Sequence, residues 1–174
     1  MAYISPQLIL IRGPIGVGKT TTVKQLRETL QPASVVELDV FKRQIDTVES
    51  TAWRRETALR AAIFMTSELM RAKRVIIADA HSSSHEQLAA YHTVAQNNQY
   101  RFRSYLLHAP LEICLSRAKE RFVEDIHYPI DEPMIRQYHE TSFDLPQEMK
   151  FDTSKMTTEA IVNVIRLHLK ANTA

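Results

Sequence analysis

The sequence predicts an α/β fold in which helices cover both faces of a parallel sheet. Short runs of continuous apolar residues, typical of strands buried on both faces, recur along the chain. Segments with apolar residues at helical spacing lie between these runs. A glycine-rich stretch joins the first apolar run to the first helical segment. Because strands and helices alternate, we expect the strands to run parallel.

The apolar runs predict strands at residues 8–11, 34–38, 75–78 and 105–108, and a weaker fifth strand at 150–152. Helical spacing predicts helices over residues 19–30, 51–73, 84–96, 111–122 and 158–169. The stretches SSSHE at 82–86 and MTTE at 156–159 are typical helix starts. Trp53 and Phe64 are expected in the core or, alternatively, on the floor of a substrate pocket.

The periodic pattern breaks between residues 123 and 146, a stretch with three prolines and mixed charges. We interpret this stretch as an excursion from the sheet rather than a linker. The 174 residues fit a single domain.

Composition excludes several classes of protein. Apolar residues make up 44% and charged residues 24%, as in ordinary folded proteins. The net charge of +2 is too small to indicate a nucleic-acid partner or an anionic membrane. The apolar runs are far shorter than a membrane helix, and the one cysteine, Cys114, has no partner for an internal disulfide. With no secretory leader visible, we expect a cytoplasmic protein.

The stretch IRGPIGVGKTTT, residues 11–22, contains the only three glycines of the chain. It satisfies the pattern G-x-x-x-x-G-K-[ST] between a predicted strand and a predicted helix, which is the context of a phosphate-binding loop. Lys19 is expected at the β- and γ-phosphates, and the Thr20 hydroxyl at Mg²⁺. Thr21 is expected at the α-phosphate. The expected nucleotide contacts are Gly13, Pro14, Ile15, Gly16, Val17, Gly18, Lys19, Thr20 and Thr21.

The alternative is a glycine-rich turn that precedes a lysine by chance, which residue frequencies make rare. The glycine count also bears on the class of nucleotide-binding protein. GTPase switches and transporter-type ATPases need glycines in later motifs, and the chain has none beyond Gly18. Small kinases remain the best fit.

Four stretches in order, IRGPIGVGKTTT, LDVFKRQ, RVIIADAH and LLHAPLEICLSRAKER, resemble the small P-loop kinases. This group includes zeta-toxin-like kinases, chloramphenicol phosphotransferase and polynucleotide 5′-kinase domains. The resemblance implies a three-layer sandwich with strand order 2-3-1-4-5 and a small lid. It also implies transfer of the γ-phosphate of ATP, with Mg²⁺, to a hydroxyl group.

Asp39 follows the second apolar run, at the expected carboxyl edge of the sheet. The resemblance implies that Asp39 receives the proton of the acceptor hydroxyl and that Lys42 and Arg43 bind the acceptor. The alternative is that Asp39 caps a helix starting at Val40 and that both basic residues are surface charges.

Asp79 follows the third apolar run and is a candidate Mg²⁺ ligand beside the phosphate loop. Its alternative role is to cap the next turn. His81 and His85 have a spacing that could bind zinc on a helix, but no third ligand is evident, so acceptor-contacting or solvent-facing histidines are the better interpretation.

Arg117 and Arg121 lie four residues apart on one face of the predicted helix 111–122. The resemblance implies that arginines here belong to a lid that neutralises charge on the transferred phosphoryl group, and Arg136 is a further candidate. The alternative is a solvated helix face. Cys114, on the same helix, is interpreted as a small buried residue.

These patterns predict an ATP-dependent phosphotransferase acting on a small-molecule acceptor. A polynucleotide 5′-hydroxyl acceptor is disfavoured by the modest charge and the absence of a basic stripe with aromatic residues. The alternative from another class is a nucleotide-binding regulator that hydrolyses ATP slowly or not at all.

Overall fold

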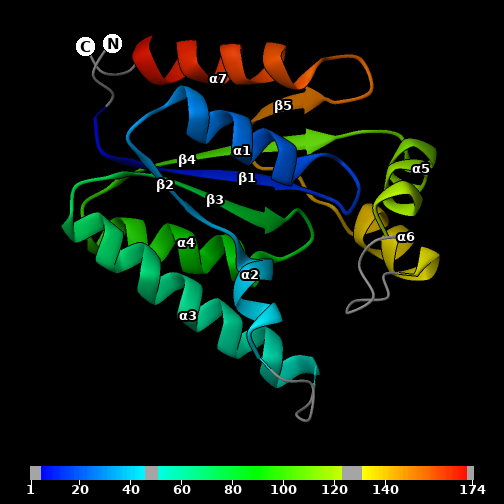
Figure 1. The fold of residues 1–174 in the computed structure, drawn as a ribbon, viewed down its shortest axis with the longest axis horizontal. Coiled ribbons are helices and arrows are strands. Elements are labelled where there is room, and N and C mark those ends of the chain that lie inside the picture. The colour runs from blue at the N-terminus through cyan, green and yellow to red at the C-terminus, as the bar shows by residue number, and fades with distance from the viewer. Residues whose placement is uncertain (1–4, 46–50, 123–130, 172–174) are drawn as a thin grey trace.

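A five-stranded, wholly parallel sheet with strand order β2-β3-β1-β4-β5 forms the centre of the molecule (Figure 1). The computed structural model describes residues 5–45, 51–122 and 131–171. The strands are β1 (Gln7–Gly13), β2 (Ala33–Val36), β3 (Val75–His81), β4 (Arg101–His108) and β5 (Met149–Asp152). The predicted fold class and strand order are therefore confirmed, including the weak fifth strand.

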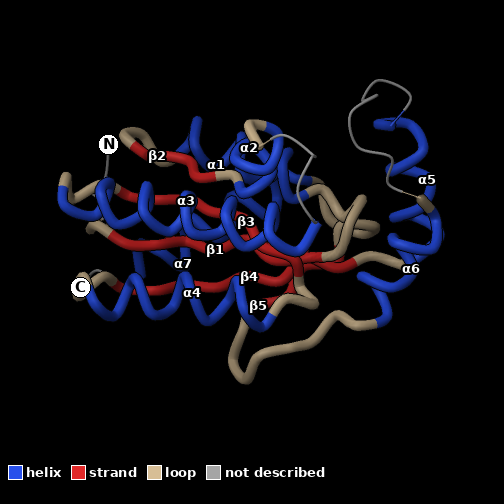
Figure 2. The backbone as a smooth tube through the Cα atoms, turned by 90° about the horizontal axis from the view of Figure 1, so that it is seen from below, coloured by secondary structure: helices blue, strands red, loops and turns tan. Residues whose placement is uncertain are grey.

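Seven helices surround the sheet within the described residues. They are α1 (Lys19–Thr29), α2 (Leu38–Arg43), α3 (Thr51–Arg71), α4 (His85–Asn97), α5 (Leu111–Phe122), α6 (Glu132–Glu140) and α7 (Thr158–Ala171). Helices α1 and α7 cover one face of the sheet, and α3 and α4 cover the other (Figures 1 and 2). Helices α5 and α6 lie beyond the carboxyl ends of the strands.

The two faces of the sheet form two separate cores, because side chains alternate along each strand. In β1, Ile9 and Ile11 pack with α1 and α7, whereas Leu8 and Leu10 pack with α3 and α4. The continuous apolar runs thus arise from strands buried on both faces, as predicted. Among the described residues, no helix combines the length and the apolar character needed to cross a bilayer.

Helix α6 was not predicted, and α2 was predicted only in the alternative that a helix starts at Val40. Helix α6 lies inside the stretch 123–146, which lacks steady periodicity because only one residue of α6, Ile135, is fully buried. A signal was nevertheless present: the Asp131 side chain accepts the N–H of Met134 at 2.9 Å, and Pro133 stands in the first turn. Helix α2 has only six residues, too few for a periodic pattern.

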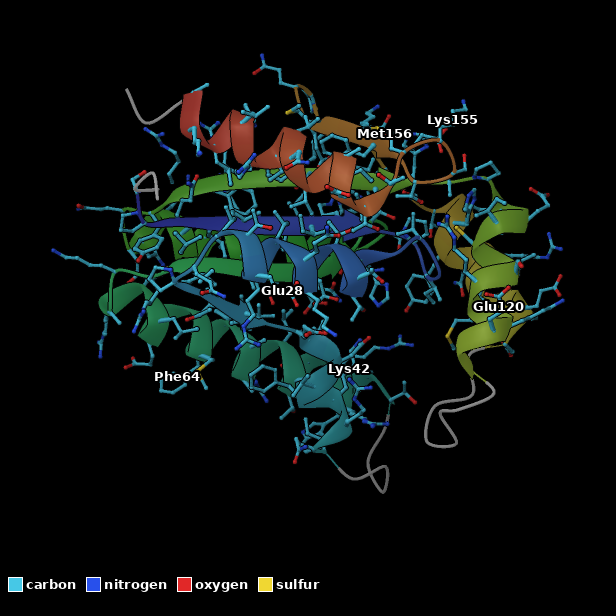
Figure 3. The ribbon with its side chains drawn as sticks, turned by 45° about the horizontal axis from the view of Figure 1, so that its top comes forward. Glu28, Lys42, Phe64, Glu120, Lys155 and Met156 are labelled. Atoms are coloured by element: carbon cyan, nitrogen blue, oxygen red, sulfur yellow. The ribbon has the colours of Figure 1, made fainter. Side chains whose placement is uncertain are left out.

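The expectation that Trp53 and Phe64 lie in the core is wrong. Both side chains are on α3, where Trp53 is 42% exposed and Phe64 is 69% exposed. Phe64 points away from the body of the molecule (Figure 3). Leu59 and Met70, which the helical spacing also placed on the apolar face of this helix, are buried as expected.

Candidate active site

The loop between β1 and α1 explains why the glycines are clustered. Gly16 and Gly18 have φ angles of 80° and 101°, in the region that disfavours other residues. A Cβ on Gly16 would also lie 2.2 Å from the carbonyl oxygen of Cys114 in α5, and one on Gly13 would lie 2.8 Å from that of Leu107. Two of the three glycines are therefore required by packing within the fold, a reason that sequence analysis missed.

The same loop presents a positive, concave backbone. The Lys19 ammonium donates to the carbonyl oxygens of Gly13 and Pro14, each at 2.9 Å. Helix α1 begins at Lys19 with Gly18 as its N-cap, without a side-chain cap and without an acidic residue in its first turn. The first amides of the helix and the ammonium therefore combine in a position suited to an anion.

The other loop residues divide into packing and accessible positions. Ile15 and Val17 are buried in the core, which anchors the loop. Thr20, in the first turn of α1, is half-buried, and Thr21 beside it is exposed. Both lie in the first turn of α1, directly after Lys19.

Asp39 does not end a strand, contrary to prediction. Strand β2 ends at Val36, and Asp39 is the second residue of α2. The capping alternative is also wrong, because the N-cap position is Glu37, whose side chain makes no capping hydrogen bond. Asp39 is exposed and therefore free to meet a ligand at the carboxyl edge of the sheet.

Lys42 holds the Asp39 carboxylate from one turn further along α2. The Lys42 ammonium lies 2.9 Å from Asp39 Oδ1, and the Lys42 side chain is nearly buried. Lys42 is labelled on α2 in Figure 3. Desolvation would raise the pKa of Asp39, but the Lys42 charge and hydrogen bond, with His81 and Lys19, outweigh it and lower the pKa. Asp39 is thus held ionised. Arg43 is exposed at the end of α2.

Asp79 lies within β3, not after it, and is paired in register with Ile11 of β1. Its side chain is 8% exposed, and Oδ1 accepts the N–H of Leu38 at 3.2 Å. Burial raises the pKa of Asp79 to about 6, with Lys19 opposing the rise and Asp39 adding to it. The capping alternative is partly realised: Asp79 caps the start of α2 rather than the turn that follows β3.

His81 and His85 both stack on aromatic rings from the segment that returns to the sheet. The His81 ring lies 4.7 Å from that of Tyr138 in α6, and the His85 ring lies 3.7 Å from that of Phe143. Burial and the charges of Lys19 and Lys42 lower the pKa of His81 to about 3. Within the described residues, no group of three or more His, Cys, Asp or Glu side chains could hold a metal ion.

The arginines predicted for a lid do not share a common partner in the described part of the structure. Arg117 donates from Nη1 to Thr153 Oγ1 and from Nη2 to Thr153 O, each at 2.9 Å, so α5 is joined to the loop after β5. Arg121 lies in the last turn of α5, and its side chain falls outside the described part of the structure. Arg136 pairs with Glu132 on the exposed face of α6.

Sequence analysis missed Arg12, which precedes the loop. Its side chain is fully buried and lies 2.7 Å from Glu148 Oε2. Arg12 also donates to the carbonyl oxygens of Ser82 and Phe143 at 3.1 and 3.0 Å and stacks on the Phe143 ring. Ser104 donates to the same Glu148 carboxylate. The only local signal was a charged residue inside an apolar run.

A cleft of about 540 Å³ lies between α3, the loop after β3 and α6. Its lining includes Arg55, Ser83, Gln137 and Tyr138. Because Tyr138 also stacks on His81, the cleft adjoins the end of β3 that pairs with Gly13 of the loop. This volume suits a small molecule.

Comparison with known proteins assigns the chain to a family. A family model described as an AAA domain matches residues 8–141, and the chain belongs to this family. The match includes the loop, α2, Asp79 and α6. No curated protein matches the chain.

Solved structures share the whole fold at low identity. A proposed kinase from Chloroflexus aurantiacus superimposes with a TM-score of 0.77 and 18% identity, covering 99% of this chain and 100% of that one. The Mycobacterium tuberculosis APS kinase CysC, in complex with AMPPNP and APS, superimposes with a TM-score of 0.69 and 18% identity. This match covers 98% of this chain and 100% of that one. A Deinococcus radiodurans tunicamycin resistance protein superimposes with a TM-score of 0.69 and 17% identity, covering 94% of this chain and 95% of that one. The expected fold of the small P-loop kinase group is confirmed.

Proposed function

We propose that the protein is an ATP-dependent phosphotransferase that moves the γ-phosphoryl group of MgATP to a hydroxyl group of a small-molecule acceptor. The observation that carries this proposal is the placement of an ionised, exposed carboxylate, Asp39, within the field of the phosphate-loop lysine, Lys19. A binding loop alone supports nucleotide binding, whereas a base beside it supports transfer to an acceptor.

The phosphate loop binds and orients the triphosphate. The amides at the start of α1 and the Lys19 ammonium supply donors and positive charge for the phosphate oxygens. Lys19 is the group that exchanges its contacts with the Gly13 and Pro14 carbonyl oxygens for contacts with the β- and γ-phosphates. Thr21 is exposed beside them and is assigned to the α-phosphate.

The residues present fit a magnesium ion, which binds hard oxygen ligands. The buried Asp79 carboxylate, whose pKa is raised by burial, and the half-buried Thr20 hydroxyl offer such oxygens. Thr20 and Asp79 would hold Mg²⁺, which neutralises phosphate charge when bound.

Asp39 orients the acceptor and takes up its proton. The acceptor hydroxyl oxygen bonds to the γ-phosphorus while the bond from that phosphorus to the β,γ-bridging oxygen breaks. The hydroxyl proton moves to Asp39, and ADP leaves. Lys42 keeps Asp39 ionised and oriented at 2.9 Å, and Arg117 and Arg121 are assigned to neutralise charge on the transferred group.

The test separates the two roles with matched variants. Lys19→Ala is expected to weaken MgATP uptake in calorimetry and to abolish acceptor-dependent ADP release. Asp39→Asn is expected to retain MgATP uptake and to lose turnover by about 10² to 10⁴-fold, because it removes the proton acceptor and leaves the phosphate loop unchanged. Lys24→Ala, an exposed lysine on the same helix, serves as the control and is expected to match the wild type.

Equal loss of MgATP binding in Lys19→Ala and Asp39→Asn would contradict the separate roles. Acceptors for the assay are nucleosides, sugars, sugar acids, aminoglycoside-like alcohols and 5′-hydroxyl oligonucleotides. If the wild-type protein binds MgATP but no acceptor stimulates ADP release, the regulatory alternative is supported.

A further inference from the structure

The cleft between α3 and α6 has a mixed lining, in which hydrogen-bonding residues lie beside the apolar residues Pro133 and Met134. Hydroxyl groups come from Ser83, Tyr138 and Thr141, and an amide comes from Gln137. This lining favours a ligand with several polar groups over an apolar one, because hydroxyls and amides that are not matched on binding cost free energy.

The cleft adjoins the proposed transfer site. The ring of Tyr138, which lines the cleft, stacks on His81 at 4.7 Å, and His81 pairs in register with Gly13 of the phosphate loop. The charges of Lys19, Asp39 and Arg55 all act on the His81 ring. A ligand in the cleft therefore lies beside His81, close to the end of β3 that pairs with the phosphate loop.

Two charged side chains, Arg55 and Asp131, line this cleft. Asp131, which also lines it, already accepts the Met134 N–H and faces the positive end of α6. Arg55 forms no ion pair or hydrogen bond with the part of the chain that the structure describes, and its guanidinium is exposed at the cleft. Its neighbour Arg54, by contrast, donates to Lys42 O at 2.9 and 2.7 Å. A guanidinium pairs best with a carboxylate or phosphate, so Arg55 is the lining residue suited to an anionic ligand.

We propose that the acceptor is a small polyhydroxylated anion, bound in this cleft with its anionic group on Arg55 and one hydroxyl at Asp39. The inference rests on the proposed phosphotransfer and specifies its acceptor class. The anion and the reacting hydroxyl lie at different ends of the ligand, so that the phosphoryl group is transferred to the end remote from Arg55. Gln137 and Ser83 contact the hydroxyl groups between these ends.

The experiment compares pairs of probes with and without an anionic group on the same carbon chain. The carboxylate arm uses D-gluconate against D-sorbitol, and the phosphate arm uses D-glucose 6-phosphate against D-glucose. D-glucosamine tests the opposite charge. MgATP-dependent ADP release is followed by a coupled assay, with KM and kcat determined for each probe. At least one anionic probe is expected to give kcat/KM at least 10-fold above its neutral partner.

Variants on α3 assign the preference to Arg55. Arg55→Gln is expected to raise KM for the anionic probe about 10- to 100-fold, with kcat changed much less, and Arg55→Lys to restore part of the loss. Arg60→Gln, an exposed arginine on the same helix that pairs with Glu56, is the matched control and is expected to leave KM unchanged. Calorimetric uptake of MgATP shows that each variant is folded.

Two failures are distinguishable. If the wild-type protein takes up no MgATP, the proposed phosphotransfer is overturned. If it takes up MgATP but responds to neither anionic probe, or responds equally to neutral ones, the acceptor class is overturned while nucleotide binding stands. An unchanged KM for the anionic probe in Arg55→Gln would overturn the role of Arg55.

Discussion

At the scale of single residues, Asp79 shows a conflict between stability and proposed function. It is a carboxylate at 8% exposure within the central sheet, and burial raises its pKa to about 6. Its hydrogen bond from Leu38 offsets only part of the cost of burying the charge. A metal ion bound to Asp79 would offset more of the free-energy cost of burying this charge. The proposed metal-binding role therefore gives a reason for a destabilising residue at this position.

The pH dependence of stability follows from this pKa. Between the ordinary value of 3.8 and about 6, the folded protein binds a proton that the unfolded chain does not. Stability therefore falls as the pH rises through this window, by on the order of 3 kcal/mol at most. Asp79→Asn removes the charge and keeps an oxygen for Leu38, so we expect this variant to be at least as stable as the wild type at pH 7.

Urea unfolding at pH 4, 5, 6 and 7 measures the effect as the wild-type free energy of unfolding minus that of Asp79→Asn. We expect this difference to decrease toward neutral pH. A difference that stays constant across the series would show that Asp79 titrates at its ordinary pKa in the folded protein.

At the scale of elements, helix α2 depends on its neighbours. Six residues are too few to form a stable helix alone, so tertiary contacts must determine its position. Asp79 of β3 accepts an N–H at its start, and Arg54 of α3 donates to the Lys42 carbonyl oxygen at its end. Asp39 lies between these two attachments, so the proposed base is placed by β3 and α3 together.

Removal of the hydrogen bonds from Arg54 to the Lys42 carbonyl oxygen, at the C-terminal end of α2, should displace Asp39. Arg54→Met is expected to cost about 1.5–3 kcal/mol of stability, the range for hydrogen bonds from a charged donor. It should also lower kcat while KM for ATP stays nearly unchanged, because Arg54 holds α2 and not the phosphate loop. Thermal unfolding and steady-state kinetics measure both effects.

Arg60→Met is the control, since Arg60 is exposed on the same helix and pairs only with surface groups. If Arg54→Met loses stability but retains full kcat, α2 does not need this contact to position Asp39.

At the scale of the whole molecule, the Arg12–Glu148 pair joins distant parts of the chain. Arg12 precedes the phosphate loop in β1, and Glu148 precedes β5, 136 residues later. Arg12 also contacts the backbone after β3 and at Phe143. The segment that returns from α6 is therefore fastened directly to the strand that carries the phosphate loop.

A double-mutant cycle measures this connection. Arg12→Met or Glu148→Met alone leaves one buried charge without its partner and should cost about 3–5 kcal/mol. The double variant removes both charges, and we expect it to cost clearly less than the sum of the two single variants. The free energies come from urea unfolding. Additive costs would mean that the two side chains stabilise the fold independently.

The extent of sequence prediction differs between fold and site. The strands, five of the seven described helices (α1, α3, α4, α5 and α7) and the phosphate loop were predicted because their signals are local: apolar period, capping residues such as Ser84, and glycines next to a lysine. The predicted site residues Lys19, Asp39 and Asp79 lie near one another, since Lys19 acts on the pKa of both carboxyl groups and Asp39 acts on the pKa of Asp79. Their separate roles are the proposals tested above.

The sequence by itself determined the class of sheet and the phosphate loop, because period and spacing are properties of neighbouring residues. Only the tertiary structure decided that Asp39 lies on a helix, that Arg12 pairs with Glu148, that Gly16 packs on α5 and that Arg55 faces a cleft formed with α6. Each of these depends on contacts between segments far apart in the chain. Such contacts leave no local period, and they form only when the parallel strands bring their carboxyl ends to one edge of the sheet.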